Sequence, residues 1–550
     1  MDYQKAFKAM DMEPSTYLLK FALPLVAIGV LFPVIMYTFL PDLFSGSANS
    51  IPIVITLVCI LFAVYYPISI LGGKAAKINN EMHYYITQMG VISTAETPRI
   101  DIIRILSENT SYALLSEESR KIYNLVVVWN LSLSDACRFT SKRTPSLIYQ
   151  DFLDRFAHGL QSGENVRSFL EAEQSVVMHE YESMYDGSLY AVEVIKEMFV
   201  SLVMALIFMA SFAIIMPVIT GMDAIMLMAM VSAVFTMVYV AILFFTKSKV
   251  PKDPIWQQTK RATEKKAKLF RSIPISLAAC LAIAIVLFFV DRFPTLIDIP
   301  MVLTPLMYTG RVASQIEKDI RRMDENFPAF IRSLGSSAGA RGGLIDDALK
   351  SLTNHDFGAL TKDVNDLYRR VNTRIDKFQA WEMFAANTGS NLIQRFSEIF
   401  VEATNLGGKP EIIGDMLANN FMRIVNLRKK RYQSSSSLVG VLYGLTAGIA
   451  FTLNISVSVV GLMQEMFASM QMDSNMSMGV IIYTDIGSVE ILSLMIMFIV
   501  FVHALVSALL IRVVNGGHML SGTTDFVIMM WIGGAGAVVM EKGVSGLLGT

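Results

Sequence analysis

Residues 428–463 read RKKRYQSSSSLVGVLYGLTAGIAFTLNISVSVVGLM, a cluster of four cations followed within ten residues by a long apolar run. The run is long enough to cross a hydrocarbon core of about 30 Å as a helix. Lys and Arg beside a span mark its cytoplasmic end. We therefore predict a membrane helix over Leu438–Met463 with the preceding polar stretch in the cytoplasm. We expect Arg428, Lys429, Lys430 and Arg431 to face anionic lipid headgroups, at about 1 kcal/mol per charge.

The composition of the whole chain supports a membrane protein. Of its 550 residues 53% are apolar and only 17% are charged, whereas charged residues make up about a quarter of a soluble domain. The net charge of −1 hides a segregation of charge along the chain. The three cysteines, Cys59, Cys137 and Cys280, are scattered, so we expect neither a disulfide framework nor a zinc site, and no cofactor.

Apolar runs predict about nine membrane helices. The sixth is the weakest, because Pro300 and Pro305 interrupt it. With the N-terminus inside, only Arg292 and Lys542 of the 46 Lys and Arg fall outside, which supports this topology and requires the sixth span by parity. In order, the runs are about Leu18–Leu40, Ile51–Leu71, Met198–Ile219, Ala224–Phe245, Ile273–Val290, the run after Asp298, Leu438–Met463, Ile491–Ile511 and Asp525–Val539.

The polar stretches between the spans show no period-two alternation, so we predict an all-α polytopic fold with two cytoplasmic helical bundles. Both bundles, and the basic connector between two of the spans, should lie on the side of the N-terminus. The predicted domains are an N-terminal two-helix hairpin (1–71), a first bundle (72–197), four spans with a basic connector at 246–272 (198–310), a second, more basic bundle (311–437) and three C-terminal spans (438–550).

The two polar stretches resemble each other in order and in membrane setting, which indicates an internal repeat. Gly407-Gly408 suits a helix stop, where positive φ is needed, and Pro410 suits the first turn of the next helix. The matching segments are Met82–Ile86 with Phe327–Ile331, Phe152–Phe156 with Leu392–Phe396, and Gln161–Glu164 with Leu406–Lys409.

Catalytic signatures are not evident. Gly407-Gly408-Lys409 lacks the upstream Gly and the following hydroxyl of a phosphate-binding loop. No local Ser/His/Asp or Cys/His pattern stands out, so we expect no enzymatic activity. Base-reading motifs are not evident either, so nucleic acid is not an expected partner.

A transporter with regulatory loops is a rival interpretation, because ionisable groups inside spans mark transport pathways. The candidate here is His503, in the middle of the eighth predicted span. We favour a neutral, hydrogen-bonded His503 over a proton relay, since no second charged group lies beside it in the spans.

Small residues in two predicted spans suggest close helix packing. Gly440, Gly444 and Gly448 form two overlapping GxxxG steps, which fit either packing within the chain or the seam of a homodimer. Gly533, Gly534 and Gly536 in the last span suggest similar packing.

The second polar stretch is rich in arginine. Many of these residues should be solvated or paired with nearby Asp along a helix. A part of them should contact a protein partner, and the candidates are Arg321, Arg322, Arg341, Arg369, Arg370, Arg374 and Arg395.

Two helical repeats, each followed by apolar spans, resemble the type II secretion system F-domain family. The likeness lies in Arg395-Phe396, Gly407-Gly408, Ile412 and Leu417, and in the weaker first copy. The length and the nine-span layout are similar to the archaeal branch of that family, the FlaJ/ArlJ-type membrane platforms of the archaellum.

The resemblance implies a platform beneath a growing filament of pilin-like subunits. Its partners would be a hexameric secretion-type ATPase, other archaellum motor components and membrane lipid. It implies coupling of ATP-driven motion to filament assembly and rotation, and it supplies no catalytic residues. A platform serving an archaeal type IV pilus or a secretion system is the alternative within the same family.

Overall fold

A computed structural model of the chain describes residues 14–27, 51–95, 97–220, 222–259, 263–290, 295–469 and 489–548, together with Phe7, Val30 and Arg261. Within these residues the secondary structure is helical, and the only β-type pairing is an isolated bridge between Trp256 and Ser390. The prediction of an all-α polytopic membrane protein is confirmed.

The chain forms two compact units. Unit 1 comprises Met1–Ser183 and Glu402–Met416, and unit 2 comprises Met184–Val401 and Leu417–Thr550. The spans that follow the first bundle and most of the second bundle therefore belong to unit 2, whereas residues 402–416 belong to unit 1. The boundaries of the five predicted domains stay a prediction.

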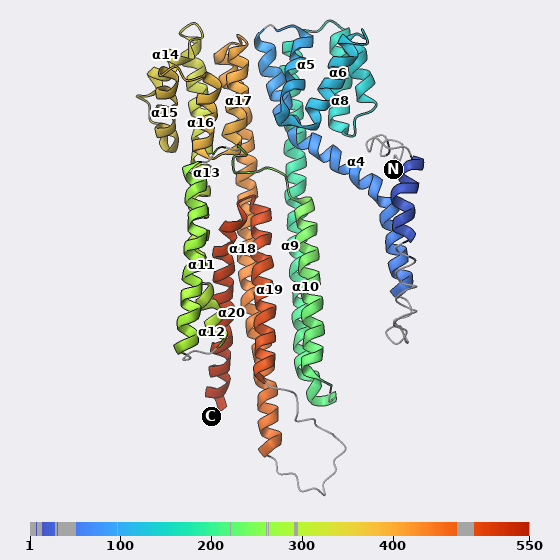
Figure 1. The fold of residues 1–550 in the computed structure, drawn as a ribbon, viewed down its shortest axis with the longest axis vertical. Coiled ribbons are helices and arrows are strands. Elements are labelled where there is room, and N and C mark those ends of the chain that lie inside the picture. The colour runs from blue at the N-terminus through green and yellow to red at the C-terminus, as the bar shows by residue number, and fades with distance from the viewer. Residues whose placement is uncertain are drawn as a thin grey trace. The chain divides into compact units, whose positions relative to one another are not determined.

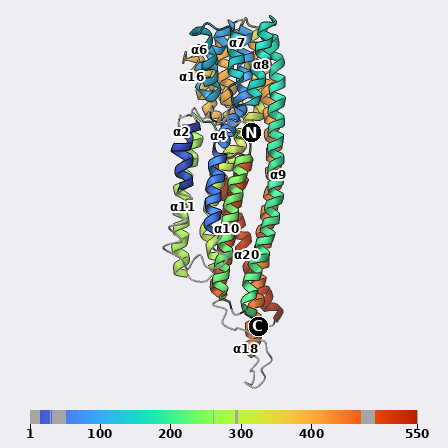
Figure 2. The ribbon, with the colours of Figure 1, turned by 90° about the vertical axis from the view of Figure 1, so that its right-hand side faces the viewer.

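The first bundle is built from antiparallel helices (Figure 2). Aromatic side chains fill its core. Tyr85, Tyr149, Phe152 and Phe156 are fully buried in it, and the Tyr85 hydroxyl lies 2.9 Å from Ser119 Oγ. The helices are α4 (Ile51–Ile92), α5 (Arg99–Glu108), α6 (Leu114–Val127), α7 (Leu133–Ser141), α8 (Leu147–Gln161) and the first part of α9 (Val166–Thr220).

The second bundle repeats this order helix for helix. Its core contains Phe327, Phe330, Phe384 and Phe396, all fully buried. α8 and α17 have 15 residues each, and each leads through a turn into a helix of more than 50 residues. The helices are α13 (Leu306–Gly339), α14 (Ile345–Leu352), α15 (Thr361–Asn372), α16 (Lys377–Thr388), α17 (Asn391–Asn405) and the first part of α18 (Pro410–Ser469). The order of elements thus reproduces the predicted repeat.

The turns before the two long helices use the same chemistry. Gly163 and Gly407 adopt positive φ, +74° and +87°, which glycine reaches without a steric penalty. Pro410 is the first residue of α18, where its missing N–H has no partner to lose. Both α9 and α18 then continue without a break from a bundle into an apolar span (Figure 1).

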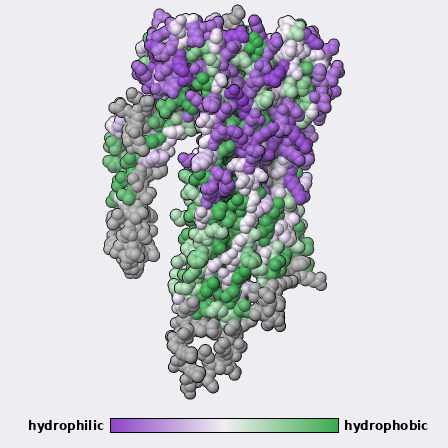
Figure 3. Space-filling model, turned by 180° about the vertical axis from the view of Figure 1, so that it is seen from behind, coloured by the Kyte–Doolittle hydropathy of each residue, from purple (hydrophilic) through white to green (hydrophobic). Residues whose placement is uncertain are grey.

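Six described helices are long and apolar enough to cross a membrane. Their surfaces are apolar where the bundle surfaces are polar (Figure 3). The segments are Val166–Val218 in α9, α10 (Ala224–Lys249), α11 (Glu264–Val290), Pro410–Met463 in α18, Ile491–Asn515 in α19 (Val489–Asn515) and Met519–Met540, mostly in α20 (Gly522–Leu548).

The predicted count of nine stays a prediction. The first predicted span lies mostly outside the described residues, and the second forms the start of α4. The weak sixth run forms α12 (Thr295–Leu303) and the first turns of α13, which pack against α11 and α20. Polar groups at the break are satisfied: Thr304 Oγ1 accepts from Trp531 Nε1 at 3.0 Å and Thr309 Oγ1 donates to the Ser272 carbonyl at 3.1 Å.

The glycines of the last span confirm the predicted close packing there. A Cβ on Gly533 would lie 2.3 Å from Val500 Cγ1, and one on Gly534 would lie 2.6 Å from the Leu296 carbonyl oxygen. These two glycines therefore let α19 and α12 approach the backbone of α20.

The glycines of α18 behave differently. No described atom lies within 4 Å of a Cβ built on Gly440, Gly444 or Gly448. Close packing of this face against another described helix of the chain is therefore not present, and the homodimer seam stays a prediction.

We predict that Gly534→Ala lowers the stability of the purified protein, because the added methyl group meets backbone and cannot be relieved by a side-chain rotation. Overpacking of this kind costs about 1–3 kcal/mol. Gly444→Ala adds the same atom in open space and should leave the thermal unfolding midpoint in detergent nearly unchanged. Equal midpoints for the two variants would contradict the assigned packing of α20.

Candidate functional site

Seven buried or nearly buried charged residues gather in unit 2 where the second bundle joins the spans. We call them the charge cluster. They come from the connector between α10 and α11, from α13, from α18 and from the α19–α20 region, so four separate segments of sequence meet there. The residues are Asp253, Glu317, Asp324, Arg428, Arg431, Arg512 and Asp525.

Arg428 is the centre of one half of the cluster. Its guanidinium binds Asp253 through both oxygens, with Nε–Oδ2 at 2.7 Å and Nη2–Oδ1 at 2.6 Å. Nη1 donates to Asp324 Oδ2 at 2.9 Å, and Nη2 also donates to the Pro254 carbonyl at 3.1 Å. The planar fork of arginine suits this bidentate geometry. One side chain of α18 thus holds both the connector and α13.

The connector is held to the bundle by backbone as well. Gln257 N donates to the Gly389 carbonyl at 2.8 Å, and Asn391 N donates to the Ile255 carbonyl at 3.0 Å. Ser390, between these two, caps α17 by accepting from Ile393 N at 3.2 Å and donates its hydroxyl to Asp324. The turn between α16 and α17 is therefore tied to the same carboxylate that binds Arg428.

Arg431 lies one turn further along α18 and binds a helix end. Its guanidinium donates to the Val514 carbonyl at 2.6 Å and to the Val513 carbonyl at 3.2 Å. These are carbonyls of the last turn of α19, where a cation also interacts favourably with the helix dipole. A Cβ on Gly516 (φ +76°) would lie 2.7 Å from the guanidinium, so glycine is needed there for this approach.

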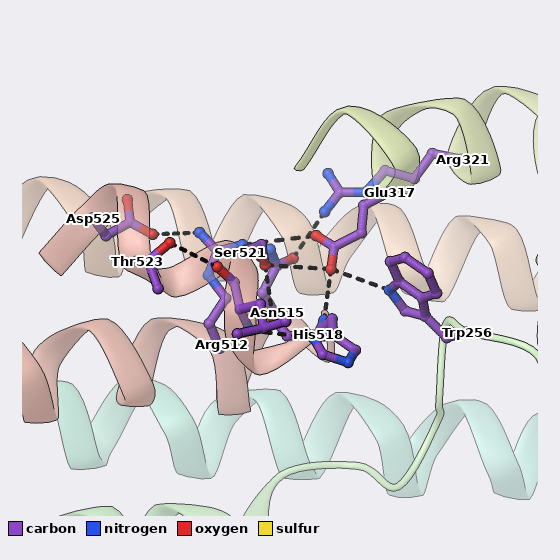
Figure 4. Close-up of polar contacts among 10 residues, drawn as sticks. Trp256, Glu317, Arg321, Arg512, Asn515, His518, Ser521, Thr523 and Asp525 are labelled. Carbon is purple, nitrogen blue, oxygen red and sulfur yellow. Dashed lines mark hydrogen bonds and ion pairs between the residues drawn. The ribbon is translucent and has the colours of Figure 1, made fainter. Parts of the chain in front are cut away.

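Glu317 and Arg512 form the other half of the cluster (Figure 4). Glu317 Oε1 accepts from the backbone N–H of His518 at 2.6 Å and from Trp256 Nε1 at 3.2 Å. Arg512 donates to Ser521 Oγ at 2.9 Å and forms an ion pair with Asp525. α13, the connector and the start of α20 thus meet at two carboxylates.

Burial governs the protonation of Asp324. It raises the pKa of this carboxyl to about 6, while Arg428 and the Ser390 hydroxyl act in the opposite direction. Asp324 thus depends on its cation to stay ionised in a buried site.

The expectation for the four cations at the end of the second bundle is wrong for two of them. Arg428 and Arg431 are each only 3% exposed and bind protein groups, so they do not face headgroups. Residues three apart share one helix face, and this face of α18 points into the cluster. Lys429 and Lys430 lie on the other face with 54% and 53% of their side chains exposed, where they pair with Glu325 and Asp186.

The seven arginines predicted to contact a partner divide by exposure. Arg322, Arg341, Arg369 and Arg374 are exposed, whereas Arg321, Arg370 and Arg395 are half-buried. Arg341 lines a hollow with Lys350 and Tyr368 of α14 and α15. The structure thus brings Arg341 close to the helix that carries Arg369.

Arg321 has a role within the chain. Its guanidinium lies 3.5 Å above the Tyr432 ring and donates to Asn515 Oδ1 at 3.2 Å. It extends the charge cluster, and its predicted contact with a partner stays a prediction.

His503 is fully buried among the spans and is hydrogen-bonded on both ring nitrogens. Nδ1 lies 2.7 Å from the Tyr239 hydroxyl, and Nε2 lies 3.0 Å from Thr446 Oγ1. A neutral ring that accepts at Nδ1 and donates at Nε2 satisfies both contacts. In the described part of the chain, no group of three or more His, Cys, Asp or Glu side chains is placed to hold a metal ion.

Comparison with known proteins shows the family. Residues 85–214 match the family of the type II secretion system (T2SS), protein F. Flagella accessory protein J of Methanococcus voltae is 35% identical over 98% of both chains. Its counterpart from Methanocaldococcus jannaschii is 33% identical over 98% of this chain and 97% of its own. The chain belongs to the flagella accessory protein J family. No solved structure gives a significant match.

Membership of the flagella accessory protein J family makes this chain a multi-pass membrane protein of the archaellum platform type, as the sequence had suggested. The secretion-family match covers most of the first bundle and most of the span that follows it in α9. The sequence had suggested that this copy of the repeat was the weaker one.

The members of the charge cluster other than Arg428 and Arg431 were missed by sequence reasoning. Arg512 and Asp525 lie at the ends of predicted spans, and Asp253 is one of two carboxylates in a connector dominated by cations. The sequence offered one signal for these residues, namely a charged side chain within one turn of an apolar run. The partners of such a side chain come from segments distant in sequence, and only the fold brings them together.

We predict that Arg428→Ala destabilises unit 2 by about 3–5 kcal/mol, because it leaves Asp253 and Asp324 buried without their cation. Lys429→Ala removes the neighbouring cation from an exposed pair and should cost less than about 1 kcal/mol. Chemical denaturation in detergent, followed by helix signal, measures both. Similar losses for the two variants would contradict the assigned role of Arg428.

The loss of unfolding free energy caused by Arg428→Ala should become smaller as the pH falls from 8 to 5. Burial raises the pKa of Asp324 and Arg428 lowers it, so removal of Arg428 raises the folded-state pKa of this carboxyl further. At low pH Asp324 is protonated with or without Arg428 and its part of the stability loss disappears, whereas at high pH only the wild type holds the carboxylate beside a cation. The same denaturation series at several pH values tests this, and a pH-independent deficit would contradict it.

Proposed function

We propose that this chain is the membrane platform of an archaellum, which docks a separate cytoplasmic hexameric ATPase and couples its motion to assembly and rotation of a filament of pilin-like subunits. The full-length similarity to two flagella accessory J proteins supports the archaellar assignment. The chain acts by binding and by transmitting motion, and chemical catalysis belongs to the ATPase.

The observation that carries the coupling is the charge cluster. Arg428 forms ion pairs with the connector and with α13, and Arg431 on the same helix face donates hydrogen bonds to the end of α19, so the bundle and a span end are held by one group of buried contacts. A displacement of the second bundle would have to break buried ion pairs or carry the spans with it. Breaking a buried pair costs several kcal/mol, so joint movement is favoured.

The proposed docking surface consists of the exposed arginines Arg322, Arg341, Arg369 and Arg374 of the second bundle. The distribution of Lys and Arg among the loops supports a cytoplasmic location for both bundles. Lys429 and Lys430 remain proposed contacts to lipid headgroups, since their side chains are about half exposed beside the span.

A platform for an archaeal type IV pilus or a secretion system is the second candidate, and the secretion-family match supports it. The flagellar names of both full-length relatives favour the archaellum. Transport is disfavoured, because His503 has partners at both ring nitrogens that a neutral ring satisfies.

We predict that Arg369→Glu with Arg374→Glu weakens binding of the purified ATPase to the full-length protein by about tenfold or more at low salt. Reversing exposed charges at an interface replaces attraction by repulsion and acts mainly on the association rate. Binding kinetics at several salt concentrations measure this.

The matched control is Lys429→Glu with Lys430→Glu, which makes the same charge change at two exposed positions next to the spans. Its affinity should stay within about twofold of the wild type. Equal affinities for the two double variants would reject the arginine surface, and no binding by the wild type would reject ATPase docking altogether.

A further inference from the structure

An exposed apolar surface lies where α6 ends. Val127, Val128 and Trp129 have 55%, 72% and 74% of their surface exposed, and Leu131 has 37%. We call these four residues the apolar tip. Single exposed apolar residues are ordinary, but a contiguous group on a polar bundle marks an interaction site. Trp is also among the residues that most often dominate the binding energy of an interface.

The backbone of the apolar tip is held in place. Val128 N and Trp129 N both donate to the Asn124 carbonyl, at 2.8 and 3.3 Å, and Leu131 N donates to the Leu125 carbonyl at 3.1 Å. Asn130 takes the left-handed conformation, φ +56°, that commonly ends a helix. Trp129 is therefore presented from a fixed turn, and little ordering is required when a partner binds.

Cations surround the apolar tip. Trp129 shares a hollow with Lys121, Arg143, Phe139 and Glu118, and Glu118 forms an ion pair with Lys121 at 2.9 Å. The Arg143 guanidinium lies 3.5 Å above the Phe139 ring. Between Leu114 and Arg143, which takes in α6, the tip, α7 and the two residues after it, there are five cations and three carboxylates. They are Arg120, Lys121, Arg138, Lys142 and Arg143 against Glu117, Glu118 and Asp135. An apolar centre with a basic rim fits a partner with an apolar pocket and an acidic rim.

The apolar tip lies at the end of the first bundle remote from the apolar half of α4. α7 starts after the tip and runs back about 14 Å along the bundle. The chain then reaches Ser146, whose hydroxyl donates a hydrogen bond to Asn79. Asn79 lies only eight residues after Leu71, the last residue of the apolar run. Since α7 ends on the side of the span, the tip is at the opposite end, away from lipid.

The geometry assigns the apolar tip as the anchor by which the first bundle binds the hexameric ATPase, through an apolar pocket rimmed by carboxylates on the ATPase. This inference rests on the proposed function, because it names a second contact of the same partner. Membrane lipid is not a suitable partner, because the apolar tip lies at the end of the first bundle remote from the span. A second copy of the chain fits poorly, because a two-fold interface at the tip would bring two basic rims together.

The test is a titration of the full-length protein in detergent with the purified ATPase from the same organism. Trp129→Ala should weaken binding by about 30-fold, the loss typical of a dominant interface residue. Leu147→Ala is the matched control: Leu147 is 69% exposed at the start of α8, at the other end of the bundle. Its affinity should stay within about twofold of the wild type.

Lys142→Glu with Arg143→Glu provides a second variant, and it should weaken binding mainly at low salt. An unchanged thermal midpoint of each variant shows that the fold is intact, as expected for exposed positions. If the wild type binds the ATPase and Trp129→Ala does not change the affinity, the inference is overturned while the proposed function stands. Failure of the wild type to bind would overturn both.

The mass of the particles in the same samples gives a further outcome. A dimer that Trp129→Ala converts to monomer, with ATPase affinity unchanged, would make the apolar tip a self-association surface and overturn the assignment.

Discussion

Two buried carboxylates of unit 2 require Arg428, and the joint between its bundle and its spans depends on that requirement. Asp253 belongs to the connector, Asp324 to α13 and Arg428 to α18. None of these side chains can leave the cluster without exposing a buried charge to an apolar surrounding, which is costly. Arg431 adds the end of α19 through its last carbonyls. A few charge-assisted contacts therefore fix elements that hydrophobic packing alone would allow to slide.

The continuous helices α9 and α18 connect the bundles directly to the spans. Each begins in a bundle and ends in a span without a turn between them. A helix with intact hydrogen bonds transmits a displacement along its axis, and α18 also carries the two arginines of the cluster. In unit 2 the bundle is thus joined to the spans by the continuous helix α18 and by the contacts of its two arginines with neighbouring elements. This arrangement supports the proposed coupling, in which a displacement of the bundle is passed to the spans.

Much of the fold followed from local sequence patterns. The apolar runs located the six long spans, and Gly407-Gly408 with Pro410 located the turn before α18, because turn chemistry and span length are local properties. The charge cluster could not be predicted in the same way. The sequence shows Arg428–Arg431 beside a span, but the 3.6-residue period places two of them inward, and the carboxylate partners of Arg428 lie 104 and 175 residues away. The exposed Trp129 was missed because composition alone does not reveal exposure.

The central claim is that the second bundle and the spans of unit 2 move as one body held by Arg428. Spin labels at exposed Asn354 in the bundle and Ser248 at the end of α10, in a variant lacking Cys59, Cys137 and Cys280, measure it directly. Pulsed electron resonance should give one narrow distance distribution, which Arg428→Ala broadens and Lys429→Ala leaves unchanged. A broad distribution in the chain that retains Arg428 would contradict the account.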